Sequence, residues 1–288
     1  MALPAEIQQE VSEWLQCQVI SVHPLGGGCI HHAQRVETAK GIYFIKYNQV
    51  SQAHNFEVEA KGLELLRSAQ ALRIPELIRQ DQVGDYAYLI LEFVESGART
   101  PKFWEQLGHG LGQLHQRRGE AFGLKYDNYI GALPQINTQK GRWLDFFREC
   151  RLRPMVELAE RKGQIDASTM HQFDQLYERL PVLFPEEAPV LLHGDLWGGN
   201  LMTGANGEPV LIDPAVYYGH REMELAFMTM FDSQPESFYE AYEEVYPLEE
   251  DWEDRIPLCN LYPLMVHVNL FGGSYLGQVK RNLRELLK

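Results

Sequence analysis

Cysteine is scarce in this sequence of 288 residues, and the four cysteines lie far apart. None forms a C-x-x-C pair with another; they are Cys17, Cys29, Cys150 and Cys259. Zinc sites and disulfide-rich secreted domains both need cysteines at short, repeated spacings, so the sequence predicts neither. We expect four reduced thiols.

Basic residues and long apolar runs are also few. Lys and Arg number 26 against 40 Asp and Glu, which gives a formal net charge of −14. Nucleic-acid affinity depends largely on clustered basic residues, so this balance argues against a nucleic-acid partner. No run approaches the roughly 18 apolar residues that cross a bilayer, and the sequence MALPAEIQQEVSEWL lacks the pattern of a signal peptide. We expect a cytoplasmic protein without a membrane partner.

The hydrophobic period gives the organisation of the chain, because there is no internal repeat, low-complexity tract or long linker. With 45% hydrophobic residues the chain can bury a large core. The period changes once, near residue 95. Before it, strand-like runs alternate with turn signals, and one helix is expected over about 53–69. The expected strands cover 19–23, 33–38, 42–47 and 86–94.

After residue 95 the pattern becomes mainly helical. The first helix carries an apolar stripe of Phe103, Leu107, Leu111 and Leu114. Further helices are expected at 142–162, 168–180, 234–245 and 251–288, with short strands and tight loops over 190–213. The sequence therefore predicts an α+β, two-lobed, protein-kinase-like fold. Residues 1–95 form a small lobe of mixed β-sheet with one helix, and residues 96–288 form a larger helical lobe.

Residues 191–214, LLHGDLWGGNLMTGANGEPVLIDP, carry the most informative motif. Asp195, Asn200 and Asp213 stand among glycines between apolar runs. Their spacing matches the catalytic loop and metal-binding Asp of the protein-kinase superfamily. Asp195 is suited to orienting a hydroxyl nucleophile, while Asn200 and Asp213 offer the hard oxygen ligands that Mg²⁺ on ATP prefers. The alternative is that these side chains cap local turns.

Lys46 and Glu59 are each expected on a buried face. Alternation in IYFIKY places Lys46 on the same side as Ile42 and Phe44, and Glu59 lies on the apolar stripe of the expected helix. Since a lone buried charge is costly, the two residues predict an ion pair that holds Lys46 against the ATP phosphates. Taken singly, an edge-strand Lys or a solvated Glu is the alternative.

Three further features suit a nucleotide site. Gly26, Gly27 and Gly28 precede the Lys46 strand and allow backbone N–H groups to approach phosphates, although a plain hairpin turn has the same composition. The apolar run over 89–95 ends where the helical lobe begins, so its backbone is expected to pair with adenine. The residues assigned to adenine binding are Glu92, Phe93, Val94 and Met202, with a core position as the alternative for Met202.

These residues together resemble the fructosamine-3-kinase and ketosamine-3-kinase family, within the aminoglycoside-phosphotransferase branch of the kinase-like fold. The resemblance covers most of the chain and is most specific in HGDLWGGN (193–200) and IDPAVYYGHREMELAF (212–227). It implies ATP and Mg²⁺ as cofactors, with Asp195 as catalytic base, Asn200 and Asp213 as metal ligands, and Lys46 paired with Glu59. It also implies phosphorylation of the sugar 3-hydroxyl of free or protein-bound ketosamines, in protein deglycation and repair by a monomer or homodimer.

Departures from the protein-kinase pattern point away from a regulated protein kinase. Gly194 replaces the Arg of H-R-D, and only ten residues separate Asp213 from Glu224, which leaves no room for a long activation segment. Trp197 stands where a protein kinase has Lys and is expected to face the acceptor, with packing under the loop as the alternative. Glu224 occupies the place of an Asp that braces the catalytic loop in related phosphotransferases, and its longer side chain leaves that role in doubt.

Two other functions stay open from the sequence. Aminoglycoside and choline kinases share the HGD-x4-N motif, and a catalytically silent nucleotide-binding scaffold would also keep this fold. Cys29 adds a regulatory prediction, because exposed N–H groups of the glycine loop favour a thiolate that peroxide oxidises. An inert small residue is the alternative at Cys29.

Overall fold

The computed structural model describes residues 3–26 and 31–288. The chain forms two compact units. The first runs as far as Phe103 and includes Gly199–Pro214, and the second comprises Trp104–Gly198 and Ala215–Lys288. A linear boundary at residue 95 assigns Gly199–Pro214 to the helical lobe, whereas here this segment belongs to the first unit. Backbone hydrogen bonds explain the difference, because Leu211 N donates to Arg73 O and Gly97 N to Thr203 O.

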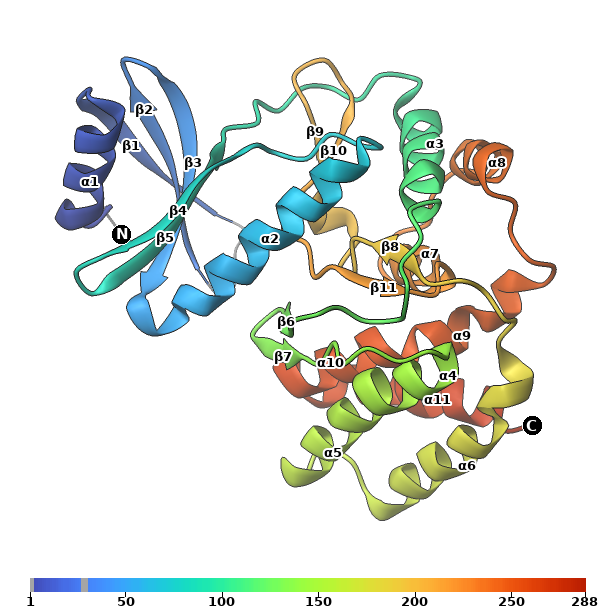
Figure 1. Ribbon diagram of the computed structural model, residues 1–288. Coiled ribbons are helices and arrows are strands. Elements are labelled where there is room, and N and C mark those ends of the chain that lie inside the picture. Colours follow the sequence, from blue (N-terminus) through green and yellow to red (C-terminus); the bar gives the residue numbers. More distant parts are fainter. Residues whose placement is uncertain (1–2, 27–30) are drawn as a thin grey trace. The chain divides into compact units, whose positions relative to one another are not determined.

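The first unit is built on a five-stranded sheet with the strand order β1-β2-β3-β5-β4 (Figure 1). Every neighbouring pair is antiparallel. The sequence analysis predicted a mixed sheet, and that prediction was wrong. The strands are β1 (Val19–Leu25), β2 (His32–Thr38), β3 (Gly41–Gln49), β4 (Leu77–Val83) and β5 (Tyr86–Glu92). The four expected strands are confirmed. The sequence did not predict β4 because LIRQDQV is a polar edge strand without apolar alternation.

Two helices pack against this sheet, one more than expected. The helix α2 (Ala53–Ala69) confirms the expected bounds and follows the short η1 (Val50–Gln52). The helix α1 (Ala5–Leu15) was not predicted, although Ile7, Val11 and Leu15 recur every four residues and are buried. Figure 1 shows α1 and α2 on opposite sides of the sheet. Five consecutive residues of β5, Ala87 to Leu91, are buried because both faces are covered.

The alternation of side chains along β3 determines on which face of the sheet Lys46 lies. Ile45 and Tyr47 belong to the core cluster that contains α1. Lys46 lies between them and therefore points to the opposite face, where α2 packs against β4 and β5. The first unit also contains the antiparallel hairpin of β9 (Leu201–Thr203) and β10 (Pro209–Leu211), next to η3 (Gly198–Asn200).

The second unit is mainly helical, and short strand pairs connect its helices. Its longer helices are α3 (Phe103–His115), α5 (Arg153–Arg161), α6 (Ala167–Leu183), α8 (Glu236–Val245), α10 (Leu261–Phe271) and α11 (Leu276–Leu286). Its shorter ones are α4 (Trp143–Phe146), η2 (Phe147–Leu152), α7 (Glu222–Met228), η4 (Trp252–Arg255), α9 (Ile256–Cys259) and η5 (Gly273–Tyr275). The strand pairs join β6 (Asn128–Ile130) to β7 (Leu133–Gln135), and β8 (Val190–Leu192) to β11 (Tyr217–Gly219).

The single helix expected over 251–288 is divided into several segments. One break follows Phe271, where Gly272 takes a positive φ of 88° that ends α10. The helix α10 is buried on nearly all sides and packs against α5, η2, α9 and α11, which makes it the centre of this unit. Within the described part of the chain, no helix is both long and apolar enough to cross a membrane.

Candidate active site

Lys46 joins two carboxylates within the first unit. Its Nζ lies 2.9 Å from Oε1 of Glu59 and 2.6 Å from Oδ1 of Asp213. Burial by itself favours the neutral amine, but the two carboxylates outweigh burial and raise the pKa of Lys46. The lysine is thus a buried cation whose charge is fixed, and the structure brings the predicted Lys46–Glu59 pair together with Asp213 of the IDP motif.

Asn200 and Asp213 lie together at one end of the β9–β10 hairpin. The side-chain amide of Asn200 donates to the backbone oxygen of Asp213, and Ile212 N donates to Asn200 O. Asp213 also has a positive φ of 54°, a conformation that non-glycine residues adopt rarely and that concentrates at functional sites.

The donors present fit a magnesium ion bound with a nucleotide. Mg²⁺ is usually held by one or two protein oxygens together with substrate phosphates, and Asn200 and Asp213 supply one amide and one carboxylate. No cluster of three or more His, Cys, Asp or Glu that could enclose a metal occurs among residues 3–26 and 31–288. One amide and one carboxylate match a metal that is shared with phosphates.

The connector after β5 is fixed by an arginine. Arg73 forms ion pairs with the carboxylates of both Glu92 and Glu208, and the backbone N–H of Glu92 donates to Glu76 O. The side chain and N–H of Glu92 are thus engaged within the protein. The adenine contacts that the sequence predicts at Glu92, Phe93 and Val94 stay predictions, and at Glu92 such a contact would use the backbone oxygen.

Other expected nucleotide contacts have different outcomes. Met202 is half-buried in β9, opposite Val210 of β10. Gly26 is exposed, and a Cβ there would meet no atom within 4 Å. Gly27, Gly28 and Cys29 lie outside the described residues, so their proposed roles stay predictions.

His31 is a residue that the sequence analysis did not select. Its ring lies 4.6 Å from that of Phe56, and Nδ1 lies 3.1 Å from the side-chain amide of Asn48. Burial first, and then the positive charge of Lys46, lower the pKa of His31 to about 4. A neutral ring therefore stands beside the lysine, and only the fold brings residues 31, 46 and 56 together.

In the second unit, the catalytic-loop motif follows β8 and needs a glycine before its aspartate. Gly194 has a φ of 84°, and a Cβ there would lie 2.1 Å from the backbone oxygen of Ala215. No larger residue fits such a close backbone approach. This contact explains why Gly194 stands where a protein kinase has Arg.

Glu224 braces this loop, which resolves the doubt about its length. Its carboxylate accepts hydrogen bonds from His193 N at 3.1 Å and Gly194 N at 2.7 Å. His115 Nε2 lies 3.1 Å from the same carboxylate, and its Nδ1 lies 2.7 Å from the Tyr242 hydroxyl. Burial acts to raise the pKa of Glu224, but the hydrogen bond with His115, the electrostatic effects of His115 and His193, and the hydrogen bond from Gly194 N hold it below its ordinary value. The buried anion thus fixes the backbone immediately before Asp195.

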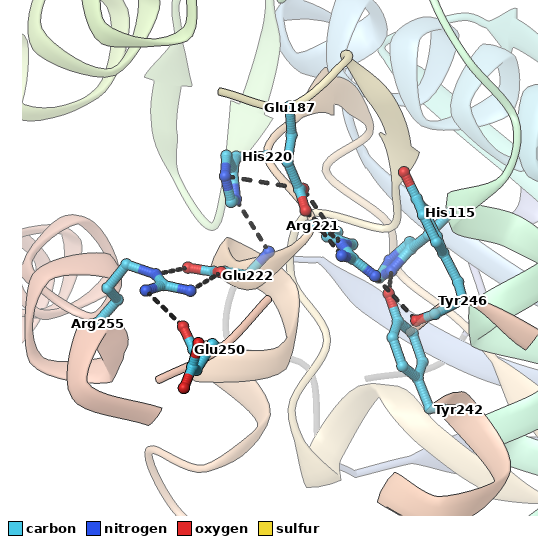
Figure 2. Close-up of polar contacts among 9 residues, drawn as sticks. All are labelled: His115, Glu187, His220, Arg221, Glu222, Tyr242, Tyr246, Glu250 and Arg255. Carbon is cyan, nitrogen blue, oxygen red and sulfur yellow. Dashed lines mark hydrogen bonds and ion pairs between the residues drawn. The ribbon is translucent and has the colours of Figure 1, made fainter. Parts of the chain in front are cut away.

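Two buried ion pairs anchor the start of α7, the helix that carries Glu224 (Figure 2). Arg221 donates to both oxygens of Glu187 and to Tyr246 O, and its guanidinium lies 3.9 Å from the centre of the Tyr246 ring. Arg255 pairs with both oxygens of Glu222 at 2.7 Å. Such two-point contacts restrict orientation as well as distance. The segment GHRE contains Arg221 and Glu222, but their partners Glu187 and Arg255 lie more than 30 residues away in the chain. The sequence analysis therefore did not predict these pairs.

A cavity within the second unit opens beside Asp195. Aromatic and aliphatic side chains form most of its wall, together with Asp195 and Glu224; among them are Ile130, Tyr217, Phe227, Tyr262, Val266 and His267. His267 Nδ1 lies 2.7 Å from Pro263 O and must donate to it, so the neutral ring keeps Nε2 as an acceptor. Trp197, two residues past Asp195, is 40% exposed. An apolar cavity with few polar groups is typical of a small-molecule site.

Comparison with known proteins identifies the family. The sequence model of the fructosamine kinase family matches residues 4–288. The chain belongs to the fructosamine kinase family. A Synechocystis relative, named a probable ketoamine kinase, is 38% identical over 92% of this chain and 89% of its own length. A relative from Arabidopsis thaliana, named a chloroplastic protein-ribulosamine 3-kinase, is 35% identical over 96% of this chain and 86% of its own. The family membership makes this chain a kinase.

Solved structures confirm the kinase-like fold. The crystal structure of a Thermobifida fusca protein, named a putative fructosamine-3-kinase, has a TM-score of 0.88 and 34% identity, with 98% of each chain covered. An aminoglycoside phosphotransferase in complex with AMP-PNP and hygromycin B has a TM-score of 0.65 and 17% identity, with 98% of this chain and 99% of that one covered. The second likeness shows the fold alone. The predicted α+β class and the family resemblance are both confirmed.

Proposed function

We propose that the protein transfers the γ-phosphoryl group of ATP to the sugar 3-hydroxyl of ketosamines of the fructosamine and ribulosamine type, in protein deglycation and repair. The observation that carries the proposal is the Lys46, Glu59 and Asp213 cluster in a chain of the fructosamine kinase family. Relatives named for ketoamine and ribulosamine kinases support the substrate class. A cytoplasmic location and a monomeric or homodimeric state stay predictions from the sequence.

Asp195 is the proposed base that orients the acceptor hydroxyl and takes its proton. General acid–base catalysis of this kind typically contributes about 10²–10⁴-fold. Its support is local, because Glu224 fixes the backbone at Gly194 and Asp195 itself lines the cavity. Phosphoryl transfer is catalysed mostly by positioning and charge neutralisation, so a rigid loop serves this reaction.

The residues of the first unit would bind the nucleotide. Lys46 supplies a permanent positive charge for phosphate oxygens, while Glu59 keeps its ammonium in place. Asn200 and Asp213 would hold Mg²⁺, which supplies neutralisation of phosphate charge when bound. Adenine is proposed to pair with the connector backbone at Glu92, Phe93 and Val94 and to contact Met202.

A substrate panel tests the proposal. Purified protein with Mg²⁺ and ATP would be assayed on fructosyl-lysine, ribulosyl-lysine, kanamycin and choline, and NMR would locate the new phosphate on its carbon. We expect turnover of a ketosamine with the phosphate on the 3-oxygen. Preferred turnover of kanamycin or choline would replace the substrate assignment, and ATP binding without turnover of any acceptor would favour a silent scaffold.

A further inference from the structure

A continuous group of rings covers part of the second unit near Trp197. We define the aromatic platform as Trp197, Phe231, His267, Phe271 and Tyr275. The ring centres are 5.6 Å apart for Trp197 and Phe231, and 5.4 Å apart for Phe231 and His267. His267 also lies 5.5 Å from Phe271 and 4.8 Å from Tyr275. Side chains from three separate segments thus meet around one histidine.

The platform is unusually open to solvent. Trp197, Phe231 and Phe271 are 40%, 41% and 57% exposed. Within the described residues, Trp14 is the one other tryptophan or phenylalanine with comparable exposure. Exposed apolar side chains are ordinary when scattered, whereas a contiguous patch indicates a binding surface. Three of these four exposed rings lie together, so they form a contiguous patch rather than scattered exposed side chains.

The platform continues into the cavity that contains Asp195. His267 belongs to both, and Phe227 of the cavity wall lies 6.4 Å from the ring of Phe231. An acceptor placed at Asp195 would consequently leave its remaining part next to these rings. This continuity indicates the rest of the substrate as the occupant, rather than an unrelated partner.

At its Trp197 end the platform favours a cation, whereas towards its Phe271 end the Lys162 ammonium donates to Asn269 O over 2.8 Å. Burial lowers the pKa of His267, so the ring at its centre is neutral near pH 7 and does not repel a positive group. A Cβ on Gly198, the neighbour of Trp197, would lie 2.9 Å from Oδ2 of Asp232, so a carboxylate stands at the edge. Aromatic faces attract ammonium groups and also pack against methylene chains.

We propose that the aromatic platform binds the aminoalkyl carrier of the ketosamine, namely the lysine side chain to which the sugar is attached. The methylene stem would lie across the rings of Phe231 and Phe271, and the substrate amine would lie near Trp197 and Asp232. This inference rests on the proposed function. Its consequence is selectivity for lysine-borne sugars over the same sugar on a small amine.

The test compares two acceptors that share a sugar. One is Nε-ribulosyl-lysine within a short peptide, and the other is the ribulosamine of methylamine. The ratio of their kcat/KM values would be measured for the wild type and for Phe231→Ala and Phe271→Ala, with Trp14→Ala as the matched exposed-ring control. We expect the ratio to fall about 3- to 10-fold in the two platform variants, as loss of one exposed aromatic contact predicts, and to stay constant in the control.

A conservative substitution separates ring chemistry from bulk. Phe271→Tyr keeps an aromatic face and should preserve the ratio, whereas Phe271→Leu should lower it. If both platform alanine variants keep the wild-type ratio, the inference is wrong while turnover of the methylamine ketosamine still supports the proposed function. If the wild type phosphorylates neither ketosamine, the proposed function itself fails.

Discussion

In the first unit the carboxylates of Glu59 and Asp213 face an ammonium group directly, whereas in the second the carboxylate of Glu224 faces backbone N–H groups and a histidine. The first arrangement sets charge, because it holds the Lys46 ammonium as a cation that can pair with a phosphate-bearing ligand. The second sets geometry, because hydrogen bonds to consecutive backbone groups fix the position of the chain. Phosphoryl transfer depends on both charge neutralisation and positioning.

The largest expected effect separates catalysis from nucleotide binding. Asp195→Asn removes the proton acceptor without removing a proposed nucleotide contact, so kcat should fall by about 10²–10⁴-fold while ATP affinity is kept. Steady-state kinetics together with calorimetric ATP titration check this. Retention of more than roughly a tenth of wild-type kcat would contradict the assignment of Asp195.

Asp213→Ala, in the first unit, is expected to weaken ATP binding, whereas Asp195→Asn is expected to keep it. Loss of its carboxylate should weaken Mg²⁺-dependent ATP affinity, since one of two proposed metal ligands is gone. The same titration with and without Mg²⁺ measures the effect. If Asp213→Ala binds ATP with Mg²⁺ as tightly as the wild type does, the metal role is wrong.

A double substitution tests the direct charge pair in the first unit. Lys46→Met leaves Glu59 buried without its cation and should lower the free energy of unfolding by about 3–5 kcal/mol. Adding Glu59→Leu should recover much of that stability, because no unpaired charge then remains. ATP affinity should stay low in both variants. Chemical denaturation and ATP titration measure the two quantities, and a double variant no more stable than Lys46→Met would contradict a pairwise account.

His220 in the second unit is expected to make the free energy of unfolding depend on pH, whereas Lys46 in the first unit stays charged. Burial lowers the pKa of His220 to about 4, and the nearby Glu187 is already paired with Arg221. Between about pH 6.5 and pH 4 the unfolded chain therefore binds a proton that the folded chain does not. Stability from this group is present near pH 7 and falls as the pH is lowered, by about 3 kcal/mol in total.

His220→Gln should remove that part of the acid dependence. Unfolding free energies at several values between pH 7 and pH 4 would be compared for the two proteins. Because His31 also has a pKa near 4, the variant should keep some slope. Equal slopes in the wild type and the variant would show that His220 titrates normally in the folded protein.

The geometric brace is tested by Glu224→Gln. The amide cannot accept from all three donors, so the loop should shift and kcat should fall by about 10²-fold, with ATP affinity unchanged. Asp166→Ala is the control, since it removes the N-cap of α6 at a stability cost of about 1 kcal/mol without contacting the loop. If Asp166→Ala lowers kcat as much, the loss reflects general destabilisation.

The smallest expected effect concerns Trp197. Trp197→Ala should raise KM for the ketosamine several-fold, as loss of about 1 kcal/mol of aromatic contact predicts, and should change KM for ATP much less. Initial rates with each substrate varied in turn measure this. A similar rise in both KM values would indicate that Trp197 packs under the loop instead of facing the acceptor.

Local patterns explain which elements could be predicted. The period-2 alternation of β3 placed Lys46 on one face, and the helical period placed Glu59 on the stripe of α2. Their ion pair followed because neither charge can be buried alone. The strand β4 has no such signal, since its residues LIRQDQV do not alternate between apolar and polar and are nearly all half-buried. The mixed sheet was wrong because strand direction depends on connections that the period does not encode.

The sequence by itself determined the chemistry: a lysine, its carboxylate partner, the HGD and IDP motifs, and therefore the kinase class. The tertiary structure alone decided which groups hold those residues in place. His115, Glu224 and Tyr242 are far apart in the chain and meet at the backbone of His193 and Gly194. The physical reason is that a buried polar group takes its partner from whatever the packing brings within hydrogen-bond distance, and sequence separation says little about that distance.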